Sequence, residues 1–360
     1  MHAIQKKSML QILVTGMHLS KKHGSTYKLI EKDGFKIDRK IKMDNTDDTN
    51  SAMAKSLGDG IKGLSTAVDE LDPDIVLVLG DRSEALSGAL VGVYLNKIVA
   101  HIHGGEVTKG CIDESIRHAI TKLAHIHFPA TEDSAKRIER MGERTENIHV
   151  VGAPGLDVIK NKYFTPEYEI RNKYNLPIDK PLILVIQHSV TQETHKAKTQ
   201  IQITLEALLE VEANIILIYP NNDAGGQAII EKIESAKLPE NFRTYVNIPR
   251  EDYLGLMSIA TALVGNSSSG IIEAPSFRLP VVNIGIRQMG RQRAENIIDV
   301  PNIKEAIIQA IKQILFDKAY RNKLSNLKNP YGDGKTSERI AKILEELEIN
   351  EELLQKQITY

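Results

Sequence analysis

The sequence is poor in cysteine and in aromatic residues. Of its 360 residues, one is cysteine (Cys111), none is tryptophan, and aromatic residues make up 5%. A single thiol excludes both a disulfide framework within the chain and a zinc site built from several cysteines. A lone free thiol is typical of a reducing compartment, so we expect a cytoplasmic protein.

The sequence also lacks a strong net charge and a long apolar run. The formal net charge is -1, which provides no overall field to attract nucleic acid or an acidic membrane. No stretch approaches the roughly 20 apolar residues that span a bilayer. Residues 1–10 lack the apolar core of a signal peptide. We therefore expect neither nucleic acid nor membrane as a partner, and any polyanionic ligand must be held by a local pocket.

What the sequence does contain is an alternation of short apolar runs with longer amphipathic stretches. β-Branched runs typical of buried parallel strands occur at residues 12–15, 75–79 and 98–102, with a shorter one at 150–151. The stretches at 52–71, 83–95 and 130–141 have the pattern of helices. Strands that alternate with helices predict a doubly wound α/β sheet in this half of the chain.

The alternation restarts after a polar segment with three prolines, residues 160–181. Strands are predicted at 182–186, 214–219, 244–246, 262–264 and 281–284, and helices at 199–212, 253–259 and 337–347. We expect an N-terminal domain over 1–165, a C-terminal domain over 166–335, and a final helix within 336–360. Two α/β halves joined by one linker predict a ligand cleft between them, at the carboxyl ends of strands.

One glycine pattern, Gly-Asp-Gly-Ile-Lys-Gly at residues 58–63, has the spacing of a dinucleotide-binding loop. Such a loop needs a strand directly before it and a helix that opens from it. Residues 58–63 instead lie within or at the end of a predicted helix. We therefore expect no nicotinamide site there.

Two carboxylates follow predicted strands of the first half. Asp81 comes directly after the strand at 75–79, and Glu106 follows the strand at 98–102. Both should lie in the same cleft, although Asp81 could instead cap the next helix. The glycines before Glu106 allow close approach to a ligand or simply a turn. His101 and His103 alternate there, but two imidazoles alone are a poor metal site, so no metal is expected.

A predicted helix follows at 113–125 and carries a third carboxylate, Asp113, in or before its first turn. Arg117 lies four residues further on, so an ion pair along the helix is one interpretation. The other is that Arg117 orients a carboxylate that points into the cleft.

The second half places polar side chains after its own strands. His188 follows the strand at 182–186, where it is either a loop residue or a partner of the carboxylates. Residues 265–270, Gly-Asn-Ser-Ser-Ser-Gly, precede a helix and predict a phosphate-binding loop rather than a plain helix cap. Glu273 could take a ribose diol. Arg287, in an arginine-rich turn, could neutralise a diphosphate or could simply be solvated.

Taken in order, these residues resemble the hydrolysing branch of the UDP-N-acetylglucosamine 2-epimerase family. The resemblance runs from about Ile12 to the final helix. The matching segments are 14–19 (VTGMHL), 80–82 (GDR), 103–106 (HGGE), 113–122 (DESIRHAITK), 187–188 (QH), 220–225 (PNNDAG), 265–270 (GNSSSG) and 287–291 (RQMGR). The family fold implies two Rossmann-like domains that face each other across a cleft, as in GT-B glycosyltransferases. In one respect the chain departs from the family, because its start resembles the family's first helix and second strand, with no counterpart of the first strand and its arginine-containing loop.

The resemblance implies roles for individual residues. Asp81, Glu106 and Asp113 would be the acid and base carboxylates, with His188 at the diphosphate side of the leaving group. The residues implied to bind the UDP-sugar are Arg82, Arg117, Asn221, Ser267, Ser268, Gly270, Glu273 and Arg287. The family also implies a homodimer, with the C-terminal helix packed on the first domain.

The implied chemistry is elimination followed by hydration. A base removes the C2 proton while UDP leaves C1, and water then adds to the resulting 2-acetamidoglucal. This sequence of steps needs no redox cofactor and no metal. UDP-N,N'-diacetylbacillosamine remains an alternative substrate, and a GT-B glycosyltransferase or a non-catalytic UDP-sugar binder remains an alternative class.

Overall fold

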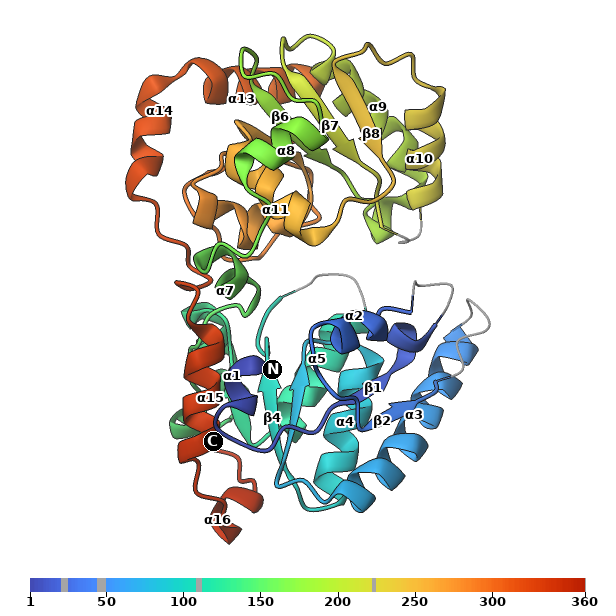
Figure 1. Cartoon of the computed structure of the whole chain (residues 1–360), viewed down its shortest axis with the longest axis vertical. Coiled ribbons are helices and arrows are strands. Elements are labelled where there is room, and N and C mark those ends of the chain that lie inside the picture. The colour runs from blue at the N-terminus through green and yellow to red at the C-terminus, as the bar shows by residue number, and fades with distance from the viewer. Residues whose placement is uncertain (21–24, 44–49, 108–111, 222–224, 360) are drawn as a thin grey trace. The chain divides into compact units, whose positions relative to one another are not determined.

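A computed structural model describes the chain except for residues 21–24, 44–49, 108–111, 222–224 and 360. The chain forms two compact α/β units (Figure 1). The first contains Met1–Glu106, Ile112–Gly152 and Lys335–Tyr360, and the second consists mainly of Ala153–Gly334. The divide after Gly152 differs from the one predicted at residue 165, because the segment that follows, with its first helix, packs with the second unit.

Unit 1 contains five short parallel strands in two sheets. β1 (Leu13–Thr15) pairs with β2 (Arg39–Ile41), and the second sheet has the order β3 (Ile75–Leu79), β4 (Ile98–Ile102), β5 (Ile126–Phe128). Its helices are α1 (His2–Gln5), α2 (Tyr27–Lys32), α3 (Asn50–Leu71), α4 (Ser83–Tyr94), α5 (Ile112–Leu123), α6 (Glu132–Arg140), α15 (Thr336–Glu346) and α16 (Glu351–Leu354).

The glycine pattern at residues 58–63 lies inside α3, as its sequence context predicted. A Cβ added at Gly63 would lie 2.4 Å from Cγ2 of Ile41 on β2. Buried Leu64 and Val68 of α3 belong to the same apolar cluster as Ile41. This glycine therefore allows the helix to approach the strand, which is a packing role.

Unit 2 contains one six-stranded parallel sheet. Its order is β11 (Ile297–Val300), β10 (Val281–Ile284), β9 (Ala262–Gly265), β6 (Leu182–Ile186), β7 (Asn214–Ile218), β8 (Phe242–Tyr245). Its helices are α7 (Gly155–Lys160), α8 (Glu167–Lys173), α9 (Ala197–Leu208), α10 (Gly226–Ser235), α11 (Arg250–Ile259), α12 (Ser269–Ile272), α13 (Lys304–Phe316) and α14 (Lys318–Lys323).

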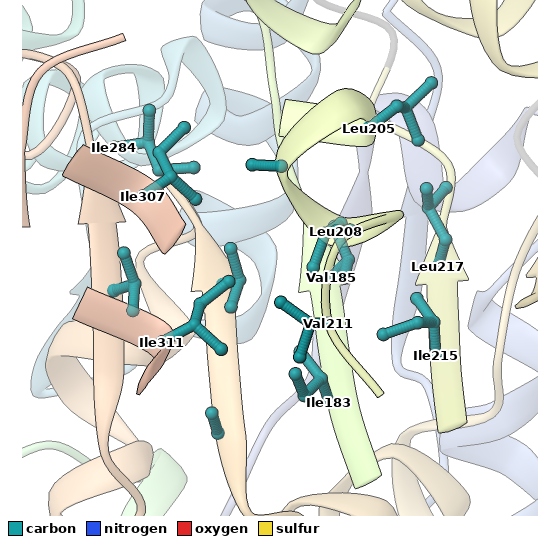
Figure 2. Close-up of a cluster of buried hydrophobic side chains, with 14 of the residues drawn as sticks. Ile183, Val185, Leu205, Leu208, Val211, Ile215, Leu217, Ile284, Ile307 and Ile311 are labelled. Atoms are coloured by element: carbon teal, nitrogen blue, oxygen red, sulfur yellow. The ribbon is translucent and has the colours of Figure 1, made fainter. Parts of the chain in front are cut away.

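The core of unit 2 lies between its sheet and helices α9 and α13. Figure 2 shows isoleucine, valine and leucine side chains of the strands meeting those of the two helices. Ile183 and Ile215 on the strands, and Leu208 and Ile311 on the helices, have no exposed surface. All five residues of β6 are buried, because both faces of a parallel sheet are covered. The strand therefore appears in the sequence as an uninterrupted run of apolar residues.

The α/β class with two Rossmann-like units is confirmed, and eight of the nine predicted strands are found within a residue or two. The strand predicted at 150–151 is wrong. Val151 N–H donates to the Pro129 carbonyl beyond the end of β5, but no ladder continues from that bond. β2, β5 and β11 were not predicted, because runs of three or four residues give too little periodicity to recognise.

The C-terminal segment packs on unit 1, although it follows the whole of unit 2 in the sequence. Ile340 of α15 joins the cluster formed by Ile98, Ile126 and Phe128 of the sheet. Thr336 Oγ1 donates to the Val151 carbonyl at 3.1 Å. Among the helices in the described part of the chain, none combines the length and apolarity needed to cross a bilayer.

Candidate active site

The candidate site of unit 1 lies at the carboxyl ends of β3 and β4. Asp81 follows β3, and Glu106 lies four residues after β4. The two strands are parallel neighbours, with Leu79 opposite Ile102, so their ends share one edge of the sheet. The placement of both carboxylates predicted from the sequence is therefore the one found.

Arg117 of α5 gathers the carboxylates of this edge. Its side chain is 2% exposed; it forms ion pairs with Asp81 and, at 2.8 Å, with Glu114. Its Nη1 also donates to the Glu106 carbonyl at 2.9 Å. Burial disfavours the charged guanidinium, but the hydrogen bond to Asp81 and the charges of Asp81, Glu106 and Glu114 outweigh it and raise the pKa of Arg117. A buried cation thus holds three carboxylates in one region.

Asp113 lies in the first turn of α5 and is half-buried. The predicted ion pair within this helix is found at a different spacing, because Arg117 pairs with Glu114, three residues earlier. Glu114 also accepts from Nε2 of His118 at 3.2 Å. Glu114 was not predicted as a site residue. Its position one turn before Arg117 was the one sequence feature that indicated an ion pair with Arg117.

The two histidines of the β4 end have different partners. His101 Nε2 donates to the Gly80 carbonyl at 2.8 Å, and burial lowers the pKa of His101 to about 4. His103 lies 2.6 Å from Glu106, measured from Nδ1 to Oε1. The two imidazoles therefore bond different groups, a backbone carbonyl for His101 and a carboxylate for His103.

The two glycines between His103 and Glu106 are packing residues. A Cβ at Gly104 would lie 2.9 Å from Nδ1 of His101, and one at Gly105 would lie 2.3 Å from the Ser134 carbonyl oxygen. Of the two interpretations left open by the sequence, these contacts support a tight turn rather than an approach to a ligand.

In unit 2, His188 and Asn266 join the ends of β6 and β9. The His188 N–H donates to Asn266 Oδ1 at 2.7 Å, and Asn266 Nδ2 donates to the His188 carbonyl at 2.9 Å. The Asn221 N–H donates to His188 Nδ1 at 3.1 Å. Because Nδ1 accepts this bond, the proton of the neutral imidazole is on Nε2, which makes Nε2 a hydrogen-bond donor.

Asn266 also fixes the turn that follows β10. Its carbonyl accepts from Arg287 Nη1 at 3.2 Å and from Gln288 Nε2 at 2.9 Å. Asn266 is 3% exposed, so all of these bonds are shielded from water. The sequence analysis gave Asn266 no role. Its position directly after a strand was the only signal.

The serine loop is held by its own hydroxyls and by a tyrosine. Tyr253 Oη lies 2.6 Å from Ser269 Oγ, which lies 2.9 Å from Ser267 Oγ. Ser268 is the N-cap residue of α12, but its side chain makes no capping hydrogen bond. Gly270 is buried, and a Cβ there would lie 2.9 Å from Val281 Cγ1. Gly270 was expected to bind substrate, and the structure gives it a packing role.

The remaining predicted residues lie at the edges of the two half-sites. Glu273 is half-buried and lies near Gly155. A Cβ added at Gly155 would lie 3.8 Å from Glu273 Oε1 and 3.3 Å from Arg250 Nη2. Arg82 is exposed and contacts Met17 Sδ at 3.9 Å. Cys111 and residues 222–224 of the PNNDAG motif lie outside the described residues.

Comparison with known proteins decides the family. A family model described as UDP-N-acetylglucosamine 2-epimerase matches residues 2–345. The chain belongs to the UDP-N-acetylglucosamine 2-epimerase family. Within this family, it is 41% identical over 348 residues to the UDP-N,N'-diacetylbacillosamine 2-epimerase (hydrolyzing) of Legionella pneumophila, covering 96% of this chain and 90% of that protein. It is 37% identical over 304 residues to the UDP-N-acetylglucosamine 2-epimerase of Neisseria meningitidis, covering 84% and 79%.

Solved structures of 2-epimerases share the fold of this chain. The crystal structure of UDP-GlcNAc 2-epimerase from Neisseria meningitidis bound to UDP-GlcNAc has a TM-score of 0.79 at 21% identity, covering 95% of both chains. A sucrose-phosphate synthase from Thermosynechococcus elongatus has a TM-score of 0.56 at 15% identity, covering 93% and 95%. The expected GT-B-like fold is therefore confirmed, and with it the family predicted from the sequence motifs.

Proposed function

We propose that the protein is a hydrolysing 2-epimerase, which converts a UDP-2-acetamido sugar and water into UDP and the free C2-inverted sugar. The observation that carries the proposal is the cluster around Arg117, where a buried guanidinium holds Asp81, Glu106 and Glu114 at the carboxyl ends of two strands. Such a group of carboxylates is suited to two proton transfers within one site.

The first step is an elimination. A base takes the C2 proton, the C2–H electron pair forms the C1=C2 double bond, and the C1–O electron pair leaves with UDP. In the second step, water adds its oxygen to C1 while a proton reaches the opposite face of C2. Asp81, Glu106 and Asp113 are the proposed acid and base groups, and Arg117 fixes the first two in place.

Unit 2 supplies the groups proposed to hold UDP. His188 presents Nε2–H as a donor to the diphosphate, and Arg287 adds a positive charge beside it through their shared contact with Asn266. Asn221, Ser267 and Ser268 add donors at neighbouring loops, and Glu273 is the proposed partner of the ribose diol. Arg82, which follows β3, is a further proposed UDP contact. No metal and no redox cofactor has a place in these steps.

The identity of the sugar is open between two related substrates. The 41% identity to a UDP-N,N'-diacetylbacillosamine 2-epimerase favours that sugar over UDP-N-acetylglucosamine, for which the relative reported above is 37% identical. Both substrates have the acetamido group at C2 and the UDP group at C1, so the same residues serve either. We further propose that the protein is a cytoplasmic homodimer. Light scattering would measure its mass in solution.

The test is a proton NMR time course with each UDP-sugar in D2O. We expect release of UDP together with a free C2-inverted sugar that carries deuterium at C2, because the C2 proton exchanges with solvent. Sugar transfer only when an acceptor is added would instead indicate a glycosyltransferase. Binding of UDP without any release of sugar would indicate a non-catalytic binder.

Asp113→Asn tests the carboxylates separately from UDP binding. The substitution keeps the size of the side chain but removes its ability to exchange a proton, so kcat should fall about 10²–10⁴-fold. The affinity for UDP, measured by calorimetry, should stay unchanged because Asp113 is not among the proposed UDP contacts. Normal turnover in this variant would remove Asp113 from the mechanism.

A further inference from the structure

The loop after β4 carries a histidine and a glutamate that are bonded side chain to side chain. His103 Nδ1 lies 2.6 Å from Glu106 Oε1. An ionised carboxylate only accepts, so Nδ1–H is the donor, and Nε2 of the neutral imidazole carries the lone pair. This is the arrangement in which a carboxylate orients a histidine for proton transfer through its second nitrogen.

His103 is the more exposed member of the pair. Its side chain is 21% exposed, whereas that of Glu106 is 12% exposed. The imidazole is therefore more accessible to a small molecule than the carboxylate it is bonded to. A carboxylate that acted directly on substrate would be expected to be the more accessible of the two.

The backbone of His103 is strained and firmly held. Its φ of 66° lies in the left-handed region, which is unfavourable for a non-glycine residue. The rest of the loop is anchored from two helices, because Arg117 Nη1 donates to the Glu106 carbonyl at 2.9 Å and Arg137 Nη1 donates to the Gly105 carbonyl. Strain that persists because its surroundings fix it is a feature of functional sites.

The charged groups near this pair come from three elements besides its own loop. Arg117 of α5 and Arg137 of α6 bring positive charge to the loop backbone, and Asp81 after β3 pairs with Arg117. Glu106 is left as the carboxylate bonded to the imidazole of His103. A proton taken up at Nε2 would therefore create an imidazolium that already has its counter-charge in hydrogen-bond contact.

We propose that His103 is the base that takes the C2 proton, and that Glu106 serves the acid and base chemistry through His103, by orienting the imidazole, and not by contact with the substrate. The inference rests on the proposed function. His103 Nε2 forms an N–H bond as the C2–H bond breaks, the C–H electron pair forms C1=C2, and the C1–O pair leaves with UDP. The imidazolium, stabilised by Glu106, passes its proton to solvent once UDP has left. Asp81 and Asp113 serve the hydration step: one carboxylate takes a proton from the water as its oxygen bonds to C1, and the other, as the carboxylic acid, gives a proton to C2.

His103→Asn separates proton transfer from positioning. Asparagine places an N–H donor near the position of Nδ1 and tolerates positive φ, but it has no counterpart of Nε2. We expect kcat to fall about 10²–10⁴-fold with KM and UDP affinity unchanged. Near-normal kcat in His103→Asn would overturn the proposal, because His103 would then only hold Glu106.

His103→Gly provides a second test at the same position. Glycine relieves the strain at positive φ and leaves space for a free imidazole molecule. We expect added imidazole to restore turnover in His103→Gly but not in His103→Asn, where the amide occupies that space. Failure of imidazole to restore any turnover to His103→Gly that still binds UDP would count against His103 as the base.

A measurement without substrate distinguishes failure of this proposal from failure of the proposed function. Long-range ¹H–¹⁵N NMR of the ¹⁵N-histidine-labelled protein should show His103 protonated at Nδ1 and unprotonated at Nε2. Protonation at Nε2 alone would overturn the proposal, even in an active epimerase. A wild-type chain that releases no free sugar from either UDP-sugar would overturn the proposed function and this inference with it.

Discussion

At the scale of single residues, His101 links the stability of unit 1 to pH. It is fully buried, and its Nε2 is bonded to the Gly80 carbonyl directly before Asp81. Its Nδ1 is a buried atom without a hydrogen-bond partner among the described residues. Protonation would place a second N–H and a charge in that position. Burial therefore holds the pKa at about 4, below the ordinary 6.5.

The sign of the pH effect follows from this lowered pKa. Between pH 6.5 and 4 the unfolded chain binds a proton at His101 that the folded chain does not, so stability falls as the pH falls. By this linkage, His101 costs unit 1 about 2 kcal/mol at pH 5 relative to pH 7. His101→Gln keeps an N–H donor for Gly80 without titrating, and urea unfolding should show a weaker loss between these pH values. An unchanged loss would assign the effect to the other buried histidines.

At the scale of elements, the carboxyl ends of β6, β9 and β10 are joined through one residue, whose side chain bonds the β6 loop and whose backbone carbonyl bonds the β10 loop. Asn266, after β9, bonds both backbone groups of His188 after β6 and accepts from Arg287 and Gln288 after β10. Three loops that each supply a proposed UDP-binding group are thereby fixed to one another. The parallel sheet alone brings these loops to one edge, and Asn266 sets their spacing.

Asn266→Ala should therefore weaken UDP binding. The substitution removes the two side-chain hydrogen bonds to His188 and keeps the backbone carbonyl that Arg287 and Gln288 contact. Loss of the two bonds costs on the order of 1–3 kcal/mol, which is about 5–150-fold in Kd if it acts on the bound state. The control is Asn283→Ala on β10, a buried asparagine whose amide bonds Asp299 at 2.7 Å. Calorimetry with UDP should show a loss for the first variant and none for the second. Equal affinities in both variants would mean that Asn266 only supports the fold.

At the scale of the whole molecule, unit 1 is completed by residues from the far end of the sequence. Besides α15, the C-terminal segment contributes Lys356, which donates to the Thr121 carbonyl at the end of α5 and pairs with Glu143. Glu143 is 3% exposed; its bonds to His127, Lys122 and Lys356 outweigh the cost of burial and hold its pKa at about 2. The helix that carries Asp113 and Arg117 is thus anchored at its other end by the C-terminal segment.

A matched pair of core substitutions tests this dependence. Ile340→Ala in α15 removes a side chain 3% exposed in unit 1, and Ile311→Ala in α13 removes one with no exposed surface in unit 2. Each should cost about 2–5 kcal/mol, but in different units. Hydrogen exchange should show lost protection in β3–β5 for Ile340→Ala and in β6–β10 for Ile311→Ala. Loss confined to α15 itself in the first variant would show that the helix is not part of the unit 1 core.

Much of the site could be predicted because strand ends are visible in the sequence. Asp81, Glu106 and His188 each follow an apolar run, and parallel strands bring such positions to one edge of their own sheet, in unit 1 for the two carboxylates and in unit 2 for His188. Glu114 and Asn266 were missed because their roles depend on which of several neighbouring polar residues points at Arg117 or His188. The substrate contact of Gly270 stays a prediction, and the structure adds that this glycine packs closely against Val281, which its sequence context did not reveal.

The sequence by itself determined the family, the α/β class and the list of polar residues at strand ends, because these follow from local periodicity and from motifs in a fixed order. The tertiary structure decided which of those residues meet. It placed a buried Arg117 among three carboxylates, set the proton of His188 on Nε2 through the Asn221 N–H, and joined His103 to Glu106. These pairings depend on side-chain directions and on contacts between segments distant in sequence, which no local pattern records.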